Sequence, residues 1–218
     1  TWAMDYYDYP SARTYSHING ETNFENYFEG SYVGYRYFSS FRVKPRYSFG
    51  YGLSYTSFEI KAENVKVEKT VVTVAAHVKN NGNRQGKEVA QLFLDGELVA
   101  FAKTKTLKPK EEEILSLSFD LAKLGSFDEK RHAFILHAGE YGLALGNQFT
   151  DAAFAVLALN QEVVTEEVSI ITSKPDFEDM KAEKIAAFPE SLPRYAVSAA
   201  DFVKLCHRTY QPEFSEKV

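Results

Sequence analysis

The sequence is poor in cysteine and in long apolar runs. Its 218 residues include one cysteine, Cys206, which excludes an internal disulfide and favours a reducing, cytoplasmic location without excluding secretion. The longest apolar run, 152–159, has the length of a strand, whereas a membrane-spanning helix needs roughly 18–20 apolar residues. We therefore expect no membrane partner.

An excess of positive charge is also lacking. The chain has 25 Lys and Arg against 30 Asp and Glu, a net charge of −5, so it offers no cationic surface to nucleic acid. Its 44% hydrophobic and 25% charged residues are ordinary for a globular protein. The length suits one domain and a smaller part, at about 100–150 residues per domain. Because no signal-like region follows Thr1, we expect any targeting signal to belong to a longer parent.

Aromatic residues, in contrast, are crowded at the start of the chain. More than half of them lie within the first 58 residues, where Gly and Pro recur and no helical or strand period is sustained. We predict that residues 1–56 run irregularly and pack their rings on a neighbouring surface. A segment of this length is too small to bury those rings by itself, so it requires a partner.

From residue 57 onwards, apolar and polar residues alternate between turn signals such as 80–83 and 95–96. Many short strands with frequent turns are typical of a β-sandwich of the immunoglobulin or fibronectin III type. The predicted fold is mainly β, with this sandwich over 57–165. The expected strands cover 58–67, 71–78, 88–94, 98–106, 114–119, 132–136, 141–145 and 153–159.

The remaining residues, 166–218, have a mixed character. Residues 172–176 resemble a helix start, and Ser198 resembles the cap of a second short helix that carries residues 202–206. Prolines lie between the two. We therefore expect a mixed helical and extended tail that is either a connector or a wrapping arm.

Two motifs carry a resemblance to a known family. Residues 26–38 read NYFEGSYVGYRYF, and residues 45–58 read PRYSFGYGLSYTSF. In this order and at this separation they resemble glycoside hydrolase family 3, the β-glucosidase family. Three later segments are similar to the fibronectin III-like domain of that family. These segments are 78–82, 86–92 and 139–146, so the resemblance covers about residues 1–160.

The resemblance implies that residues 1–56 end an α/β sandwich domain and that the parent is a retaining β-glucosidase acting on a β-glucoside or oligosaccharide. In that family a barrel domain carries the Asp nucleophile, usually before Trp, and an upstream loop carries the Glu acid/base. The single Trp here, Trp2, follows Thr1, so neither catalytic residue carries over. Because retaining hydrolysis needs both carboxyl groups, we predict that this chain alone is inactive. It uses no cofactor and braces the other, catalytic domains of the same hydrolase.

The motif residues are predicted to hold domains together rather than to contact sugar. The glycines at positions 34, 50 and 52 are expected to take a positive φ or to approach another element closely. The rings are expected to bury flat areas between domains, and Glu29 and Arg36 to pair or to cap backbone groups. The predicted structural set is Glu29, Gly30, Gly34, Tyr35, Arg36, Phe49, Gly50, Gly52 and Tyr55, with Tyr37 beside it.

The start of the chain is the candidate for substrate contact. Trp2, Asp5 and Tyr6 follow what resembles the last parallel strand of the α/β domain, and ligands usually bind at the C-terminal ends of such strands. An aromatic face beside a carboxylate suits a sugar. We therefore predict Trp2, Asp5 and Tyr6 as substrate-binding residues.

No metal site is predicted. His132 and His137 are five residues apart on a strand and its turn, and this odd spacing places the two side chains on opposite faces. Cys206 and His207 are adjacent, which is not a metal-ligand spacing. The turn 81–83 lacks the acidic ligands of a calcium loop.

Several alternatives remain open for the function and for the parent. A permuted parent, in which the barrel follows the fibronectin-like domain, would use the tail as its connector, whereas an arm that only wraps the molecule explains the same residues. A stand-alone carbohydrate-binding or adhesive β-sandwich would need no enzymatic parent. A proteolytic product would have no independent role.

Overall fold

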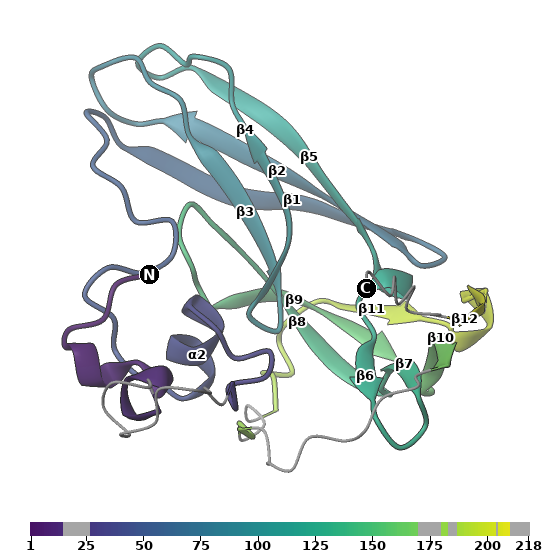
Figure 1. Cartoon of the computed structure of the whole chain (residues 1–218). Coiled ribbons are helices and arrows are strands. Elements are labelled where there is room, and N and C mark those ends of the chain that lie inside the picture. The colour runs from purple at the N-terminus through teal and green to yellow at the C-terminus, as the bar shows by residue number, and fades with distance from the viewer. Residues whose placement is uncertain (15–26, 170–179, 183–186, 204, 210–218) are drawn as a thin grey trace, which may run out of the picture.

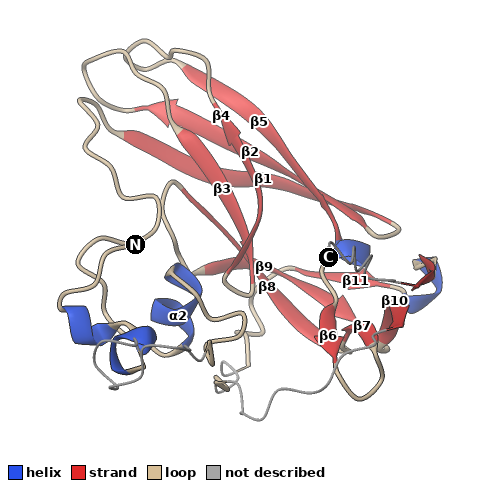
Figure 2. Cartoon of the chain, in the orientation of Figure 1, coloured by secondary structure: helices blue, strands red, loops and turns tan. Residues whose placement is uncertain are grey.

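The computed structural model describes residues 1–14, 27–169, 180–182, 187–203 and 205–209. Its strands form three sheets, and the aromatic N-terminal segment lies against one end of them (Figure 1). Strands dominate and helices are few and short (Figure 2), so the fold is mainly β, as predicted. Within the described ranges no helix is long and apolar enough to cross a membrane.

The first sheet has three antiparallel strands in the order β1-β2-β5. They are β1 (Phe58–Glu68), β2 (Val71–Asn80) and β5 (Glu112–Asp120). In β2 every second side chain is buried, because successive side chains of a strand point to opposite faces. The buried set of β2 contains Val72, Val74, Ala76 and Val78, as the alternation in the sequence predicts.

The second sheet has five strands in the order β11-β9-β8-β3-β4. They are β3 (Val89–Leu94), β4 (Glu97–Lys103), β8 (Gly139–Gly146), β9 (Ala153–Leu159) and β11 (Arg194–Val197). All neighbours are antiparallel except β11, which runs parallel to β9. Strand β11 comes from the tail, so part of the tail completes an edge of this sheet.

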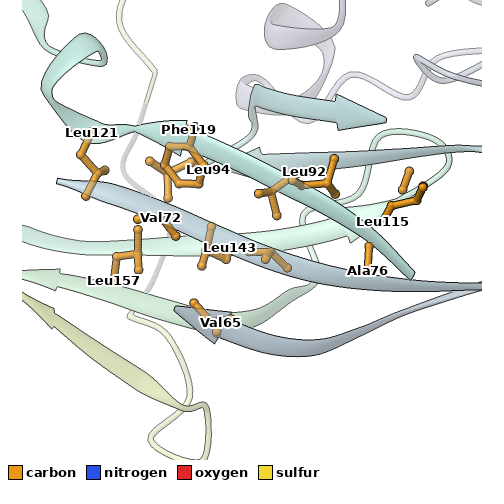
Figure 3. Close-up of a cluster of buried hydrophobic side chains, with 14 of the residues drawn as sticks. Val65, Val72, Ala76, Leu92, Leu94, Leu115, Phe119, Leu121, Leu143 and Leu157 are labelled. Carbon is orange, nitrogen blue, oxygen red and sulfur yellow. The ribbon is translucent and has the colours of Figure 1, made fainter. Parts of the chain in front are cut away.

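The hydrophobic core lies between these two sheets. Leu92 and Leu143 of the five-stranded sheet are fully buried there, as is Leu117 of β5. Burying such a side chain contributes roughly 1.5–3 kcal/mol. Figure 3 labels a wider set, comprising Val65, Val72, Ala76, Leu92, Leu94, Leu115, Phe119, Leu121, Leu143 and Leu157.

A tyrosine near the start of β8 stabilises the turn before that strand through a hydrogen bond. The Tyr141 hydroxyl donates a 2.6 Å hydrogen bond to the backbone carbonyl of His137, four residues upstream. This arrangement corresponds to the tyrosine corner of immunoglobulin-like sandwiches. Burial, reinforced by the charge of Asp95, raises the pKa of Tyr141, so the hydroxyl stays protonated and remains a donor.

The sequence did not predict a third sheet. Its order is β12-β10-β7-β6, with β6 (Ser126–Asp128), β7 (Ala133–Leu136), β10 (Val163–Ser169) and β12 (Leu205–Thr209). Of these strands only β7 matches a predicted one. Strand β6 is three residues long, and β12 pairs with β10 from a distant part of the chain.

The tail differs from the prediction where the second helix was expected. Ser198 does cap a turn, its hydroxyl accepting a 3.3 Å hydrogen bond from Ala200 N, but the turn is a 3₁₀ turn of three residues, Ala199–Asp201. Residues 205–209 then form β12 instead of continuing a helix, because parallel pairing with β10 supplies their backbone partners. The predicted helix start at 172–176 lies outside the described residues.

The N-terminal segment contains short helical pieces between irregular stretches. Two 3₁₀ turns cover Tyr6–Asp8 and Pro10–Arg13, and the helix α2 covers Tyr35–Ser40. Gly34 precedes α2 with φ of 61°, a conformation that glycine adopts without steric cost. The helix α2 was not predicted, since six residues are too few to show a helical period.

Candidate functional site: the aromatic segment and its exposed face

Part of the aromatic segment is fixed to the sandwich by a ring cluster. Tyr35 stacks on Phe49 with 4.6 Å between ring centroids, and it also contacts Phe93 of β3 and Phe149 after β8. The Tyr35 hydroxyl accepts a 2.9 Å hydrogen bond from the backbone N–H of Leu98 in β4. The two motifs are thereby packed onto one end of the five-stranded sheet.

An ion pair and a buried carboxylate flank this cluster. Arg36 of α2 pairs with Glu97 of β4 at 2.5 Å, so its observed partner is Glu97 rather than Glu29. Glu29 is 8% exposed, and its backbone carbonyl accepts a hydrogen bond from Tyr32 N at 2.9 Å. Gly30 follows with φ of 57°, which turns the chain towards α2.

Gly50 is the tightest point of the second motif. Its φ is 86°, and a Cβ added there would lie 2.7 Å from the carbonyl oxygen of Asn147 and 2.9 Å from Nε2 of Gln91. Next to it, the Phe49 carbonyl accepts a 2.6 Å hydrogen bond from Phe149 N. Gly52 differs, because an added Cβ would meet nothing within 4 Å and its φ is not in the left-handed region.

A buried asparagine joins the segment to the sandwich. Asn80, at the end of β2, accepts a 2.7 Å hydrogen bond from the Thr56 hydroxyl and a 3.1 Å bond from Gly82 N. Its amide nitrogen donates to the carbonyls of Arg84 and Leu107 at 2.7 and 3.0 Å. We call Asn80 with these four hydrogen-bond partners the Asn80 hub. The sequence predicted a turn here but not a buried polar residue, because an Asn-Asn-Gly-Asn run indicates only a tight turn.

Other residues of the segment expose their aromatic rings. Tyr47 contacts both Trp2 and Tyr51, at centroid distances of 6.2 and 4.7 Å. An antiparallel bridge joins Trp2 and Tyr47 through a 2.8 Å backbone bond. The exposed fractions are 66% for Trp2, 40% for Tyr47 and 50% for Tyr51. We call these three residues the aromatic platform.

The three predicted substrate-binding residues do not form one cluster. The Asp5 carboxylate accepts a 2.9 Å hydrogen bond from Tyr7 N and so caps the first 3₁₀ turn. Tyr6 is half-exposed and makes an edge contact with Tyr7 at 5.5 Å. Trp2 instead belongs to the aromatic platform. A sugar-binding role for the three therefore stays a prediction.

Beyond the platform, the chain leading into β1 is also exposed. Leu53 is 88% exposed and Tyr55 is 89% exposed, so neither is buried by the described part of the chain. The prediction that Tyr55 is buried between domains would require polypeptide other than these residues. Exposed apolar side chains gathered in one region usually mark an interaction surface.

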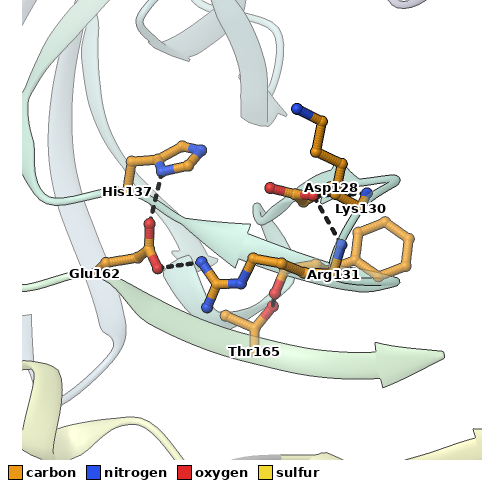
Figure 4. A network of polar contacts seen from close by, with 7 residues as sticks. Asp128, Lys130, Arg131, His137, Glu162 and Thr165 are labelled. Atoms are coloured by element: carbon orange, nitrogen blue, oxygen red, sulfur yellow. Dashed lines mark hydrogen bonds and ion pairs between the residues drawn. The ribbon is translucent and has the colours of Figure 1, made fainter.

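A network of polar side chains lies at the end of the molecule away from the aromatic segment (Figure 4). Glu162 accepts from Arg131 Nη1 at 2.5 Å and contacts His137 Nδ1 at 3.0 Å. The bond from Arg131, aided by His137, lowers the pKa of Glu162 below its ordinary value. All three residues are exposed, and no group of three or more metal-ligating side chains occurs in the described part of the chain. We assign this network to holding the turn before β8 against β10.

A comparison with known protein families agrees with the two packed sheets of the sandwich. Residues 88–148, which run from β3 to the turn after β8, match the family model of the fibronectin type III-like domain. The chain contains a fibronectin type III-like domain. The strand order of both sandwich sheets, β1-β2-β5 and β9-β8-β3-β4, agrees with this assignment.

Relatives extend the similarity beyond the fibronectin type III-like domain. A β-glucosidase of Ruminococcus albus is 38% identical over 168 residues, 70% of this chain and 17% of that protein. β-Glucosidase A of Butyrivibrio fibrisolvens is 30% identical, over 78% of this chain and 24% of that protein. The resemblance to glycoside hydrolase family 3 is confirmed. The chain spans about a fifth of the length of these relatives.

Solved structures show the same relationship. β-Glucosidase 3B of Thermotoga neapolitana, in complex with α-D-glucose, superposes with a TM-score of 0.67 at 34% identity. It covers 74% of this chain, which corresponds to 24% of that protein. A β-glucosidase of Paenibacillus barengoltzii gives a TM-score of 0.68 at 33% identity, over 78% and 21% of the two chains.

Proposed function

We propose that this chain is the non-catalytic, bracing part of a retaining β-glucosidase that degrades β-glucosides or oligosaccharides. The relatives are β-glucosidases several times longer than the chain, which leaves room in such proteins for separate catalytic domains. The fibronectin type III-like domain supplies a self-sufficient core. The aromatic segment is the part that contacts the catalytic domains.

The observation that carries this proposal is the difference between two parts of the aromatic segment. Tyr35, Phe49 and Gly50 fix the segment to the sandwich. The aromatic platform, Leu53 and Tyr55 are exposed to solvent. Apolar side chains that the described residues leave uncovered are suited to burial against another domain.

The chemistry of glycoside hydrolysis supports a non-catalytic role. A retaining enzyme places two carboxyl groups about 5–5.5 Å apart, one as nucleophile and one as acid/base. Asp5 and Asp8, the acidic pair beside the platform, both accept backbone N–H groups and serve as caps of a 3₁₀ turn. We therefore place the nucleophile and the acid/base on other polypeptide.

Two measurements test the proposal. Purified chain 1–218, assayed with a chromogenic β-glucoside, is expected to show no turnover above buffer, and measurable turnover by pure chain contradicts it. The exposed Trp2 provides the second readout, since its indole should be oxidised readily by hydroxyl radicals in the chain alone. In the complete gene product the oxidation of Trp2, followed by peptide mass spectrometry, should be slower, and an equal rate there would refute docking through this face.

The tail bears on the order of domains in the parent. Strand β11 pairs with β9 of the sandwich and β12 pairs with β10 of the third sheet, which supports an arm that wraps the molecule. We propose that it then leads to a barrel domain that follows the fibronectin type III-like domain. The mass of the native gene product, or the reading frame after Val218, tests this order, and a stop codon there eliminates it.

A further inference from the structure

A surface groove lies on the open side of the sandwich, between the edge strand β1 and the edge strand β11. Its volume is about 440 Å³, within the range of roughly 300–1,000 Å³ that is usual for ligand sites. Val65 and Ala155, both buried, belong to its lining. Its walls come from three strands, β1, β9 and β11, together with the end of β8.

The lining combines flat apolar surfaces with free polar groups. Phe154, Pro193 and Tyr195 line the groove on the side of β9 and β11, and Phe154 and Tyr195 are partly buried. Glu63 and Asn64 line it on the side of β1, and within the described residues neither side chain makes a hydrogen bond or an ion pair. A lining that combines aromatic rings with unengaged carboxylate and amide groups matches a sugar ring, whose faces are apolar and whose edge carries hydroxyls.

The backbone of β1 explains why these polar groups stand at the groove. The pairing register of β1 with β2 shifts between Ala62 and Asn64, so Glu63 is the extra residue of a β-bulge. Bulges re-aim side chains and often lie beside functional sites. Lys61, in contrast, is paired with Glu59, which leaves Glu63 without a neighbouring cation from its own strand.

The same features disfavour an extended peptide as the occupant. A peptide that adds to a sheet edge needs a regular row of backbone donors and acceptors. The bulge at Glu63 interrupts that row on β1. Pro193, directly before β11, lacks an N–H and removes a donor at the start of the other edge. Both edges of the groove are thus poor templates for strand addition.

We propose that this groove is a binding site for a neutral oligosaccharide of β-linked pyranose units. The rings of Phe154 and Tyr195 stack on sugar faces, and Glu63 and Asn64 bond to sugar hydroxyls. The site lies wholly within this chain, so it does not depend on the docking of the aromatic platform. Failure of this inference therefore leaves the bracing role untouched, and the reverse also holds.

Cellotetraose titrated into chain 1–218, followed by calorimetry and by amide chemical shifts, tests the site. We expect saturable binding, with shifts confined to residues 60–65, 152–155 and 193–195. Glu63→Ala combined with Asn64→Ala should weaken binding at least about tenfold, because two hydrogen-bonding groups are lost. Both positions are exposed, so the fold should be retained, as circular dichroism can verify.

Phe101→Ala is the matched control, since it removes an exposed ring of β4 that belongs neither to the groove nor to the aromatic platform. It should leave cellotetraose affinity unchanged within about twofold. No saturable heat and no shifts up to about 10 mM cellotetraose would overturn the proposal. Binding that is lost in Trp2→Ala and retained in the groove variants would overturn it as well, and would assign sugar binding to the platform.

Discussion

The sandwich and the aromatic segment are both rich in apolar residues, but they differ in how far the described chain buries these side chains. In β2, Val72 and Val74 are fully buried because a second sheet of the same chain covers them. In the segment, Tyr35 is covered by the sandwich, whereas Trp2 and Tyr55 are not covered by described residues. The first region therefore has its core within the chain, whereas the second keeps exposed rings, which we propose to be half of an interface.

The two regions also differ in how their contacts are distributed. The sandwich is held by many equivalent strand pairs, such as β1 with β2 and β2 with β5. The segment is held at a few points, among them the Tyr35 cluster, the Gly50 contact and the Asn80 hub. A single substitution should therefore detach the segment more easily than it unfolds the sandwich.

The largest expected effect is that of a Leu→Ala substitution in the sandwich core, which we compare with a Leu→Ala substitution in the aromatic segment. Leu92→Ala removes a fully buried side chain from the core and should lower the free energy of unfolding by about 2–5 kcal/mol. Leu53→Ala removes the same atoms from a side chain that is 88% exposed, so its effect should stay within about 0.5 kcal/mol. Urea denaturation of both variants measures the contrast. Equal losses would show that the regions share one core.

Gly50→Ala should detach the segment from the sandwich. The new Cβ would lie 2.7 Å from backbone atoms of Asn147 and Gln148, at a φ of 86°. Strain and overpacking together should cost about 2–4 kcal/mol. Gly52→Ala is the control, because its Cβ would meet nothing within 4 Å. Protease cleavage within the first 56 residues should accelerate in the first variant only, and identical rates would contradict the assigned contact.

Asn80→Ala should loosen the junction between the regions. It leaves the carbonyls of Arg84 and Leu107 and the N–H of Gly82 without their side-chain partner, at a cost of about 1–3 kcal/mol. Asn81→Ala, one residue further and exposed, should cost less. Thermal unfolding of both variants measures this, and a larger loss for Asn81→Ala would contradict the hub.

Tyr51→Ser should barely change the stability of the chain alone, within about 0.5 kcal/mol, because the ring is half-exposed. In the complete gene product the same change should lower the melting temperature, because the proposed docking buries the platform. Phe101→Ala, on an exposed face of β4, is the control in both backgrounds. Equal effects of Tyr51→Ser in the two backgrounds would argue against docking.

The smallest expected effect is a dependence on pH at the polar network. Arg131 lowers the pKa of Glu162 in the folded chain, so Glu162 stabilises the fold above its ordinary pKa near 4.5. That contribution is lost as the pH falls through the lowered pKa. The stability difference between wild type and Glu162→Gln should therefore shrink as the pH falls below the ordinary value and through the lowered pKa. Ser126→Ala, an exposed change in β6 that removes no titratable group, should show no such trend.

Local sequence patterns predicted the sandwich well because most of its strands show alternation of apolar and polar residues between clear turn signals. The alternation of Val72 to Val78 defines β2, and Asp95-Gly96 defines the hairpin between β3 and β4. Strand β11 was missed because only four residues separate Pro193 from the cap at Ser198, and β12 was missed because that cap indicated a helix over residues 202–206. A four- or five-residue strand with a distant partner leaves no periodic signal of its own.

The candidate site was predictable in part. The motifs singled out Tyr35, Phe49 and Gly50, and these residues do contact the sandwich. Their partners, Glu97 and Phe149, were not singled out, because a surface Glu and a loop Phe are ordinary until the fold brings them together. The burial of Asn80 likewise depends on Thr56 and Leu107, which no turn motif reveals.

The parallel strand β11 has a consequence for the order of events during synthesis. The edge of β9 is finished only by Arg194–Val197, and residues 160–193 emerge from the ribosome between the two strands. Throughout that interval the nascent sandwich presents an open β9 edge that other nascent chains could extend. The tail thus acts as a built-in closure, and truncating the gene before residue 194 should yield a polypeptide that aggregates as it is made.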